Sequence, residues 1–184
     1  MRHVRYSVAM SLDGYIADPQ GGYDWIIIDP GFDFDAMFKG YDAVLMGRKS
    51  YNAAKQHGGY GMPDKKAYVF SKTLQQADCP DATLSDDPRK TVTELKKMKG
   101  KDIWLFGGGE LFRSLLALRL VDEIEVAVIP VLLGAGLAML PSPGATAKLV
   151  LTKHKLFRKT GTLLLNYDVK YARTSRHGNL GGSA

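Results

Sequence analysis

Three consecutive glycines in the stretch IWLFGGGELF, residues 103–112, lie between an apolar run typical of a buried strand and a run with helical spacing. A strand that passes through glycines into a helix exposes backbone N–H groups and the positive end of the helix dipole, with no Cβ to block a ligand. Glycines also occur wherever a strand turns tightly into a packed helix. Gly107, Gly108 and Gly109 therefore predict either a phosphate site or a structural turn.

Two further strand ends carry groups that suit a phosphate. The stretch VLMGRKSY, residues 44–51, repeats the plan of a buried strand, a glycine and polar groups at the head of an expected helix. The groups at this second junction are Gly47, Arg48, Lys49 and Ser50. The stretch YVFSKTL ends a third strand in Ser71 and Lys72, a hydroxyl and a cation that suit a phosphate monoester. Ligands of open parallel sheets bind outside the carboxyl ends of the strands, so the three junctions predict one anion site.

The periodicity of apolar residues predicts the elements that must position these junctions. Strands are expected over residues 4–10, 42–47, 67–71 and 123–134, and helices over residues 32–40, 91–100 and 110–120. Two β-type runs within residues 148–173, separated by Lys-Thr-Gly-Thr, predict an antiparallel hairpin. This order of elements predicts an α/β fold with a mostly parallel central sheet, helices on its faces and an antiparallel edge.

The chain is interpreted as one domain over residues 1–173. The tail that follows, residues 174–184, has little to bury and is expected to be disordered. Within the second expected helix, Val92, Leu95 and Met98 recur at helical spacing, and the helix is expected to stop at Gly100.

Composition and charge limit the classes of function. The 184 residues are 45% hydrophobic with a net charge of +6, and residues 88–184 hold 16 Lys/Arg against 7 Asp/Glu. These cations are expected to form a solvated surface or to bind a charged small ligand. Nucleic acid is not an expected partner, because no basic stripe is interleaved with aromatic residues. The short apolar stretch in the first twenty residues predicts neither a signal peptide nor a membrane span.

Cysteine and histidine usage argues against thiol and metal chemistry. Cys79 is the only cysteine and lies beside acidic residues, which disfavour a thiolate. No intramolecular disulfide is possible with one cysteine, and a reducing compartment, the cytoplasm, is expected. The four histidines show no metal-ligand spacing, so no metal is expected.

The stretches MGRKSY, VFSKTL and LFGGGELF, in that order and preceded by VAMSLDGYIA, together resemble the dihydrofolate reductase superfold. More narrowly, they are similar to the reductase domain of bacterial riboflavin biosynthesis and its stand-alone relatives, and the similarity covers Arg2 to Arg173. The resemblance implies a three-layer fold with helices on both faces of the central sheet and a C-terminal antiparallel hairpin. It also implies NADPH as hydride donor and a homodimer.

Carried over by position, the resemblance assigns contacts to the cofactor. The loop around the cofactor phosphates corresponds to Gly47, Arg48, Lys49 and Ser50, and the pair that faces the adenosine 2′-phosphate corresponds to Ser71 and Lys72. The pyrophosphate turn corresponds to Gly107, Gly108, Gly109, Glu110 and Leu111. Ala9 matches a position whose backbone holds the nicotinamide carboxamide, and Ile16 one that packs beside the ring. The spaced glycines of the Rossmann fingerprint are absent.

Acidic residues of two loops are candidates for the substrate side. The loop SLDG borders the substrate in the riboflavin-type reductases, although Asp13 also stands in a standard Asp-Gly turn. A carboxylate early in the first helix holds the pterin in dihydrofolate reductase proper, and Asp29, Asp33 and Asp35 are the candidates here. Acids before a helix also serve as N-caps, the favoured interpretation for Asp33 and Asp35. Trp25 either lines the substrate pocket or packs in the core.

The chemistry of such a site needs few catalytic side chains, because the cofactor supplies the hydride while the protein positions the reacting carbons and manages one proton. We predict an NADPH-dependent oxidoreductase acting on a small heterocycle, imine or carbonyl, of the 5-amino-6-(5-phosphoribosylamino)uracil reductase type. The sequence lacks the His/Cys signature of the zinc deaminase that often accompanies this reductase. Two alternatives stay open: dihydrofolate reductase, and a non-catalytic nucleotide-binding module with an anionic partner.

Overall fold

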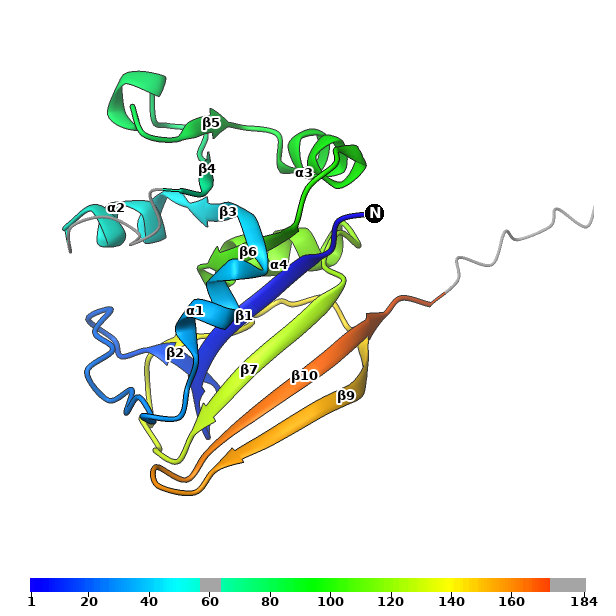
Figure 1. The fold of residues 1–184 in the computed structure, drawn as a ribbon. Helices are drawn as coiled ribbons and strands as arrows, with labels where there is room; N and C mark the ends of the chain where they lie inside the picture. Colours follow the sequence, from blue (N-terminus) through cyan, green and yellow to red (C-terminus); the bar gives the residue numbers. More distant parts are fainter. Residues whose placement is uncertain (57–63, 173–184) are drawn as a thin grey trace, which may run out of the picture.

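The computed structural model describes residues 1–56 and 64–172. Its centre is an eight-stranded sheet with the strand order β5-β4-β3-β6-β1-β7-β10-β9 (Figure 1). The strands from β5 to β7 run parallel, and β10 is antiparallel to both β7 and β9. The predicted α/β fold with a mostly parallel sheet and a C-terminal antiparallel hairpin is confirmed. The expected disordered tail, residues 174–184, lies outside the described residues.

Short strands and helices alternate along most of the chain. The strands of the large sheet are β1 Val4–Ser11, β3 Tyr41–Gly47, β4 Lys66–Phe70, β5 Thr83–Ser85, β6 Asp102–Gly107, β7 Glu123–Ile129, β9 Lys148–Phe157 and β10 Thr162–Lys170. A small second sheet pairs β2 Tyr15–Ala17 with β8 Leu137–Ala138. The helices are α1 Phe34–Lys39, α2 Arg48–Gln56, the 3₁₀ turn η1 Gln76–Asp78, α3 Pro88–Lys97 and α4 Gly109–Ala117.

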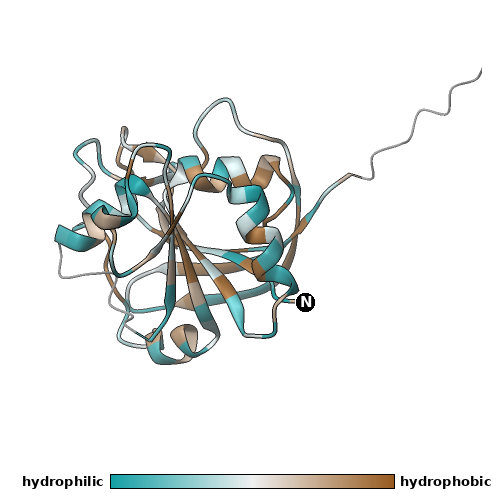
Figure 2. Cartoon of the chain, turned by 90° about the horizontal axis from the view of Figure 1, so that it is seen from above, coloured by the Kyte–Doolittle hydropathy of each residue, from teal (hydrophilic) through white to brown (hydrophobic). Residues whose placement is uncertain are grey.

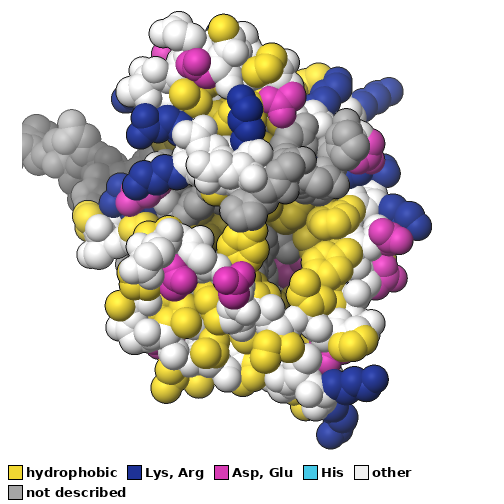
Figure 3. Space-filling view, turned by 90° about the vertical axis from the view of Figure 1, so that its left-hand side faces the viewer, with side chains coloured by type: hydrophobic (Ala, Val, Ile, Leu, Met, Phe, Trp, Pro, Cys, Tyr) yellow, Lys and Arg dark blue, Asp and Glu magenta, His cyan; other side chains and the backbone are white. Residues whose placement is uncertain are grey.

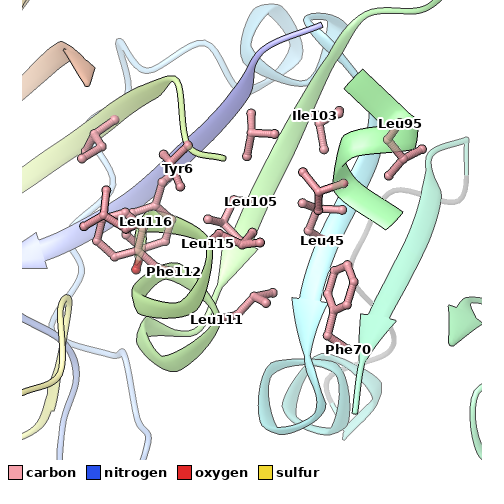
Figure 4. Packing of buried hydrophobic residues seen from close by; sticks show 14 of the residues in the cluster. Tyr6, Leu45, Phe70, Leu95, Ile103, Leu105, Leu111, Phe112, Leu115 and Leu116 are labelled. Atoms are coloured by element: carbon pink, nitrogen blue, oxygen red, sulfur yellow. The ribbon is translucent and has the colours of Figure 1, made fainter. Parts of the chain in front are cut away.

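Helices cover both faces of the sheet, and each face has its own core. On one face, which we call the α1/α2 face, Tyr51 of α2 and Phe38 of α1 pack with Trp104 of β6. On the other, the α3/α4 face, Leu95 and Phe112 belong to a larger cluster centred on β1, β3 and β6 (Figure 4). Viewed from above, strands with many hydrophobic residues lie between helices of mixed hydropathy (Figure 2). This alternation follows from strands that are buried on both faces.

Helix α3 differs from its prediction at both ends. It begins at Pro88, earlier than expected, because Asp87 accepts a hydrogen bond from the N–H of Lys90 at 2.9 Å and proline needs no acceptor in the first turn. Val92 and Leu95 are buried. The helix ends before the predicted Gly100: Met98 follows its last residue with an extended backbone, and its side chain is 52% exposed.

Two other elements are shorter than the apolar pattern indicates. The strand predicted over residues 123–134 ends at Ile129, since Pro130 has no N–H to donate to a ladder. The helix predicted over residues 110–120 is α4, which ends at Ala117, followed by Arg119 in the left-handed region at φ 58°.

The contact between α4 and β1 generates a stability prediction. Phe112 is 1% exposed and stacks on Tyr6 with ring centroids 4.1 Å apart. We expect Phe112→Ala to lower the free energy of unfolding by about 3–5 kcal/mol, because it leaves a cavity in the larger core. Urea denaturation followed by circular dichroism checks this. Leu132→Ala, at a side chain that is 70% exposed, is the control and should change stability by less than about 0.5 kcal/mol.

Candidate active site

Strands β1 and β6 part before they reach the carboxyl edge of the sheet. Their ladder pairs only Val4–Tyr6 with Ile103–Leu105. On its other side, β1 pairs with β7 over its length from Arg5 to Ser11. A gap therefore opens beside β1 in the middle of the sheet.

Alternate residues of β1 direct their backbone groups into this gap. The carbonyl oxygen of His3 accepts a hydrogen bond from the N–H of Ile103 at 2.8 Å, and that of Ser7 accepts one from the indole N–H of Trp104 at 3.1 Å. The backbone N–H and C=O groups of odd-numbered β1 residues thus point toward β6, because the side to which these groups point alternates along a strand. Ala9 follows this alternation beyond the last ladder pair. Its N–H and C=O are therefore available to a planar polar group of a ligand.

The β3–α2 and β6–α4 junctions lie against each other beside the gap. A Cβ on Gly47 would lie 3.8 Å from the Cβ of Leu111, and a Cβ on Gly108 would lie 3.3 Å from the hydroxyl oxygen of Ser50. The junctions meet because β3 and β6 are neighbours, with Met46 paired to Gly107. The starts of two helices therefore face one place, where both dipoles favour an anion.

The three glycines of the β6–α4 junction have different structural roles. Gly107 has φ 132°, a conformation that favours glycine, and its peptide bond to Gly108 is cis. Leu111 donates its N–H to the carbonyl of Gly108 at 3.0 Å, so the N–H groups of Gly109 and Glu110 precede the first intrahelical bond. A Cβ on Gly109 would lie 2.5 Å from the carbonyl oxygen of Ala138. Gly109 therefore also serves packing, which sequence alone could not separate from phosphate binding.

The third junction is joined to the second by a residue that sequence reasoning missed. Arg48 donates to the hydroxyl of Thr73 at 3.1 Å, and the Ser71 hydroxyl oxygen lies 3.3 Å from that of Thr73. Ser71 also accepts hydrogen bonds from the N–H groups of Thr73 and Leu74, both at 3.1 Å, which turns the chain after β4. The hydroxyl two residues after Ser71 was a signal in the sequence. Lys72 and Lys49 are exposed on this edge.

Aromatic rings line the α1/α2 face next to the gap. Consecutive ring centroids lie 4.6–5.8 Å apart along the series Phe157, Phe32, Phe34, Phe38, Trp104 and Phe106. On the carboxyl edge of the strands, hydrophobic side chains border a hollow (Figure 3). Ile16 is half-buried in β2, and the half-buried Trp25 donates its indole N–H to Gly22 at 3.4 Å. This row of rings was not predicted from the sequence, although the FDF pattern of residues 32–34 is a sign of it.

Asp13 joins two loops of the site. Its carboxylate accepts hydrogen bonds from the Ser11 hydroxyl at 2.6 Å and from the backbone N–H groups of Gly134 at 2.7 Å and Leu133 at 3.1 Å. The Ser11 bond is the largest cause of a lowered pKa for Asp13, and the two N–H groups add to it. These contacts favour the turn interpretation, with the carboxylate holding the loop after β1 to the loop after β7.

The acids around α1 are distributed between capping and the interior. Asp33 caps α1 by accepting the N–H of Ala36 at 2.8 Å, as the N-cap interpretation predicted. Asp35 is exposed in the first turn. Asp29 is only 8% exposed and accepts hydrogen bonds from Gly31 N–H at 2.8 Å and from the Thr160 hydroxyl at 3.1 Å.

Three further features can be described for residues 1–56 and 64–172. In these ranges no three His, Cys, Asp or Glu side chains gather as metal ligands would. Burial is the main cause that raises the pKa of the Cys79 thiol, which lies inside the α1/α2-face core. In the part of the chain that the structure describes, no helix is long and apolar enough to span a membrane.

A central gap beside β1, two helix starts at the neighbouring strand ends and a C-terminal hairpin define a dihydrofolate reductase-like α/β protein. The chain belongs to the RibD C-terminal domain family, which it matches over residues 2–163. It is 37% identical over 147 residues to the uncharacterized protein YyaP of Bacillus subtilis (strain 168), a match that covers 73% of this chain and 78% of that protein.

Solved structures share the fold. A putative riboflavin biosynthesis protein from Shewanella sp. PV-4 has a TM-score of 0.78 at 24% identity, covering 93% of this chain and 100% of that one. A diaminohydroxyphosphoribosylaminopyrimidine deaminase/5-amino-6-(5-phosphoribosylamino)uracil reductase from Thermotoga maritima has a TM-score of 0.68 at 19% identity, covering 92% and 57%. Dihydrofolate reductase from Enterococcus faecalis, complexed with NADP(H) and RAB-propyl, has a TM-score of 0.66 at 14% identity, covering 92% and 97%.

The Asp13 contacts generate a pH prediction. A carboxylate whose pKa is lowered in the folded state stabilises that state above the unfolded pKa of about 4, and this contribution is lost as the pH falls through the folded pKa. We expect Asp13→Asn to lower the melting temperature at pH 6 and to have progressively less effect as the pH approaches 3. Thermal melts across this range check it, with Asp24→Asn in the next loop as the control. A constant difference between wild type and Asp13→Asn would contradict the role of the charge.

Proposed function

We propose that this chain is an NADPH-dependent reductase that transfers a hydride to a small heterocycle, of the 5-amino-6-(5-phosphoribosylamino)uracil reductase type. Membership of the RibD C-terminal domain family supports the reaction class. The Thermotoga maritima protein of the same fold bears that reductase activity in its name, and the Enterococcus faecalis enzyme was solved with NADP(H). The reducing cytoplasm suits a chain with one buried cysteine.

One observation carries the proposal: the unpaired backbone of Ala9 and the paired helix starts lie on the same edge of the sheet. A nicotinamide at the gap and a pyrophosphate at the helix starts satisfy both sets of backbone groups at once. Next to these helix starts, toward β4, lie the side chains of Arg48, Thr73 and Ser71. Cations and hydroxyls at that end suit the 2′-phosphate that distinguishes NADPH from NADH.

Each part of the cofactor is assigned to its own residues. Ala9 would hold the carboxamide of the nicotinamide, and Ile16 would pack beside the ring. The phosphates would lie against two sets of donors. These are Gly47, Arg48, Lys49 and Ser50 with Gly107, Gly108, Gly109, Glu110 and Leu111 on one side, and Ser71 and Lys72 with Thr73 on the other. NADPH, when bound, supplies the hydride, and the protein orients the acceptor and excludes water.

The acceptor is proposed to lie on the α1/α2 face, between the gap and the aromatic row. Its ring would stack among aromatic side chains, with Trp25 as a wall. We expect Asp13 to position loops instead of exchanging a proton, because its oxygens already accept three hydrogen bonds. Dihydrofolate is the less favoured acceptor. Asp33 is committed to capping and Asp35 is exposed. Asp29 is buried, but its oxygens already accept hydrogen bonds from Gly31 and Thr160.

We also propose that two copies associate through the α3/α4 face of β9. This edge strand presents Leu149, Leu151 and Leu156 at 43%, 50% and 50% exposure. The β10 partners of the first two, Val169 and Tyr167, pack on the core. Leucines such as Leu149 and Leu151, exposed on an edge strand beside core residues, are expected to be covered by a partner.

Cofactor preference is the first test of the function. We expect NADPH to quench tryptophan fluorescence at concentrations at least about tenfold lower than NADH, because hydrogen bonds to a charged phosphate are strong. Ser71→Ala with Lys72→Ala should remove this preference and leave NADH binding unchanged. Lys55→Ala, at the far end of α2, is the control. Equal affinity for both nucleotides would contradict the 2′-phosphate site, and binding of neither would favour the non-catalytic alternative.

The association surface has a test within one strand. Leu149→Asp with Leu151→Asp should halve the mass measured by light scattering, because charges cannot be buried without partners. Val150→Asp is a matched control, since its side chain is 48% exposed on the opposite face of β9. A wild-type protein that stays monomeric at a concentration of roughly 100 µM would contradict the proposal. This concentration corresponds to an association free energy of about −5 kcal/mol.

A further inference from the structure

A row of paired residues leads across the sheet from the gap to the hairpin. Ala9 pairs with Ala127, Ala127 with Leu164, and Leu164 with Lys155. Directly paired residues point to the same face, which is here the α1/α2 face, because the alternate residues Val4 and Tyr6 belong to the other core. Three strand spacings place Lys155 about 14 Å from Ala9. Small or apolar side chains lie between them.

This row ends at an open pocket of about 340 Å³, which we call the hairpin pocket. Its lining includes Asp29, Gly31, Lys155, Phe157, Arg158 and Lys159. Phe157 belongs to the aromatic row, which connects the pocket to the region beside the gap. The hairpin pocket is therefore on the same face of the sheet as the proposed acceptor. It is separated by the paired row from Ala9, where the nicotinamide is proposed to bind.

The charges of the hairpin pocket are unbalanced. Asp29 is buried, and its oxygens are taken up by Gly31 and Thr160, so it braces the loop before α1 against the hairpin turn. Lys155 donates to the carbonyl of Gly31 at 3.3 Å and lies over the Phe157 ring. Among the described residues, Lys155, Arg158 and Lys159 have no carboxylate within ion-pair distance, whereas Arg5, Lys96, Arg113 and Lys170 do.

We propose that the hairpin pocket binds a phosphate monoester carried by the acceptor, with Lys155, Arg158 and Lys159 as its cations. Arginine contacts phosphate through two parallel hydrogen bonds and lysine through a point charge, so the three together suit a dianion. An acceptor ring between the gap and the aromatic row, with a pentose phosphate attached, would extend along this row toward Lys155. On the carboxyl edge, basic side chains at the lower margin stand apart from those in the upper part, with hydrophobic side chains between (Figure 3). The cofactor phosphates and the acceptor phosphate would thus have separate sites.

This proposal rests on the proposed function for the identity of the ring, but its binding test does not need turnover. We would titrate the protein with ribose 5-phosphate, ribose and inorganic phosphate by calorimetry. We expect ribose 5-phosphate to bind more tightly than either of the other two. Lys155→Gln, Arg158→Gln and Lys159→Gln together should weaken it at least about tenfold. Arg158→Gln with Lys159→Gln, which keeps the Lys155 contact to Gly31, should weaken it by a smaller factor.

A matched control separates a site from general attraction. Lys97→Gln, Lys99→Gln and Lys148→Gln remove the same charge at exposed positions outside the hairpin pocket. This variant should bind ribose 5-phosphate as the wild type does. The proposal is overturned if the control loses binding equally, if the pocket variants lose none, or if ribose binds as well as its phosphate. Inorganic phosphate binding as tightly as the sugar phosphate would overturn the assignment to an acceptor.

Turnover distinguishes this proposal from the proposed function. With 5-amino-6-(5-phosphoribosylamino)uracil and its dephosphorylated form, the pocket variants should lower kcat/KM only for the phosphorylated acceptor. An equal loss with both acceptors would overturn the phosphate role. If the wild type oxidises NADPH with neither acceptor, the proposed function fails, and the calorimetric result still decides whether the hairpin pocket binds a sugar phosphate.

Discussion

The interrupted ladder between β1 and β6 is the constraint on which the site depends. Backbone N–H and C=O groups in a sheet interior are costly to leave without partners, and β6 stops supplying them after Leu105. β1 nevertheless stays in place, because β7 pairs with it through Ser11. The unpaired groups at Ala9 are therefore held rigidly by a strand that is fixed on one side. A ligand that meets them needs little reorganisation of the protein.

The β3–α2 and β6–α4 junctions lie at the carboxyl edge of the sheet, beside this gap. Because β3 and β6 are adjacent, the starts of α2 and α4 are brought together without a dedicated loop, and Gly47 and Gly108 keep side chains out of the space between them. The core on each face holds one of these helices, through Tyr51 for α2 and Phe112 for α4. The meeting of two helix starts, an arrangement that favours negative charge, thus follows from ordinary packing in a doubly covered sheet.

Local patterns of apolar residues and glycines predicted most of the strands and helices. They could not predict contacts between segments that are distant in the sequence. Apolar runs and glycines marked β3, β6 and the hairpin, and they gave the three junctions in the right order. The pattern overextended α4 and the strand β7, where the left-handed Arg119 and Pro130 intervene. It could not reveal the early end of the β1–β6 ladder, because register depends on both strands. Nor could it show that Asp13 holds Gly134, or that Gly109 lies under Ala138, since those partners come from elsewhere in the chain.

The bond from Leu133 to Asp13 joins residues 120 positions apart, and β1 lies between two strands that are both made much later. During synthesis from the N-terminus, β1 therefore emerges long before β6 and β7 exist to cover its edges, on the order of ten seconds at ordinary elongation rates. The buried residues Val4 and Tyr6 are exposed on the ribosome for that time. The gap beside β1 can therefore form only after most of the chain has been made, because both strands that border β1 come from its second half.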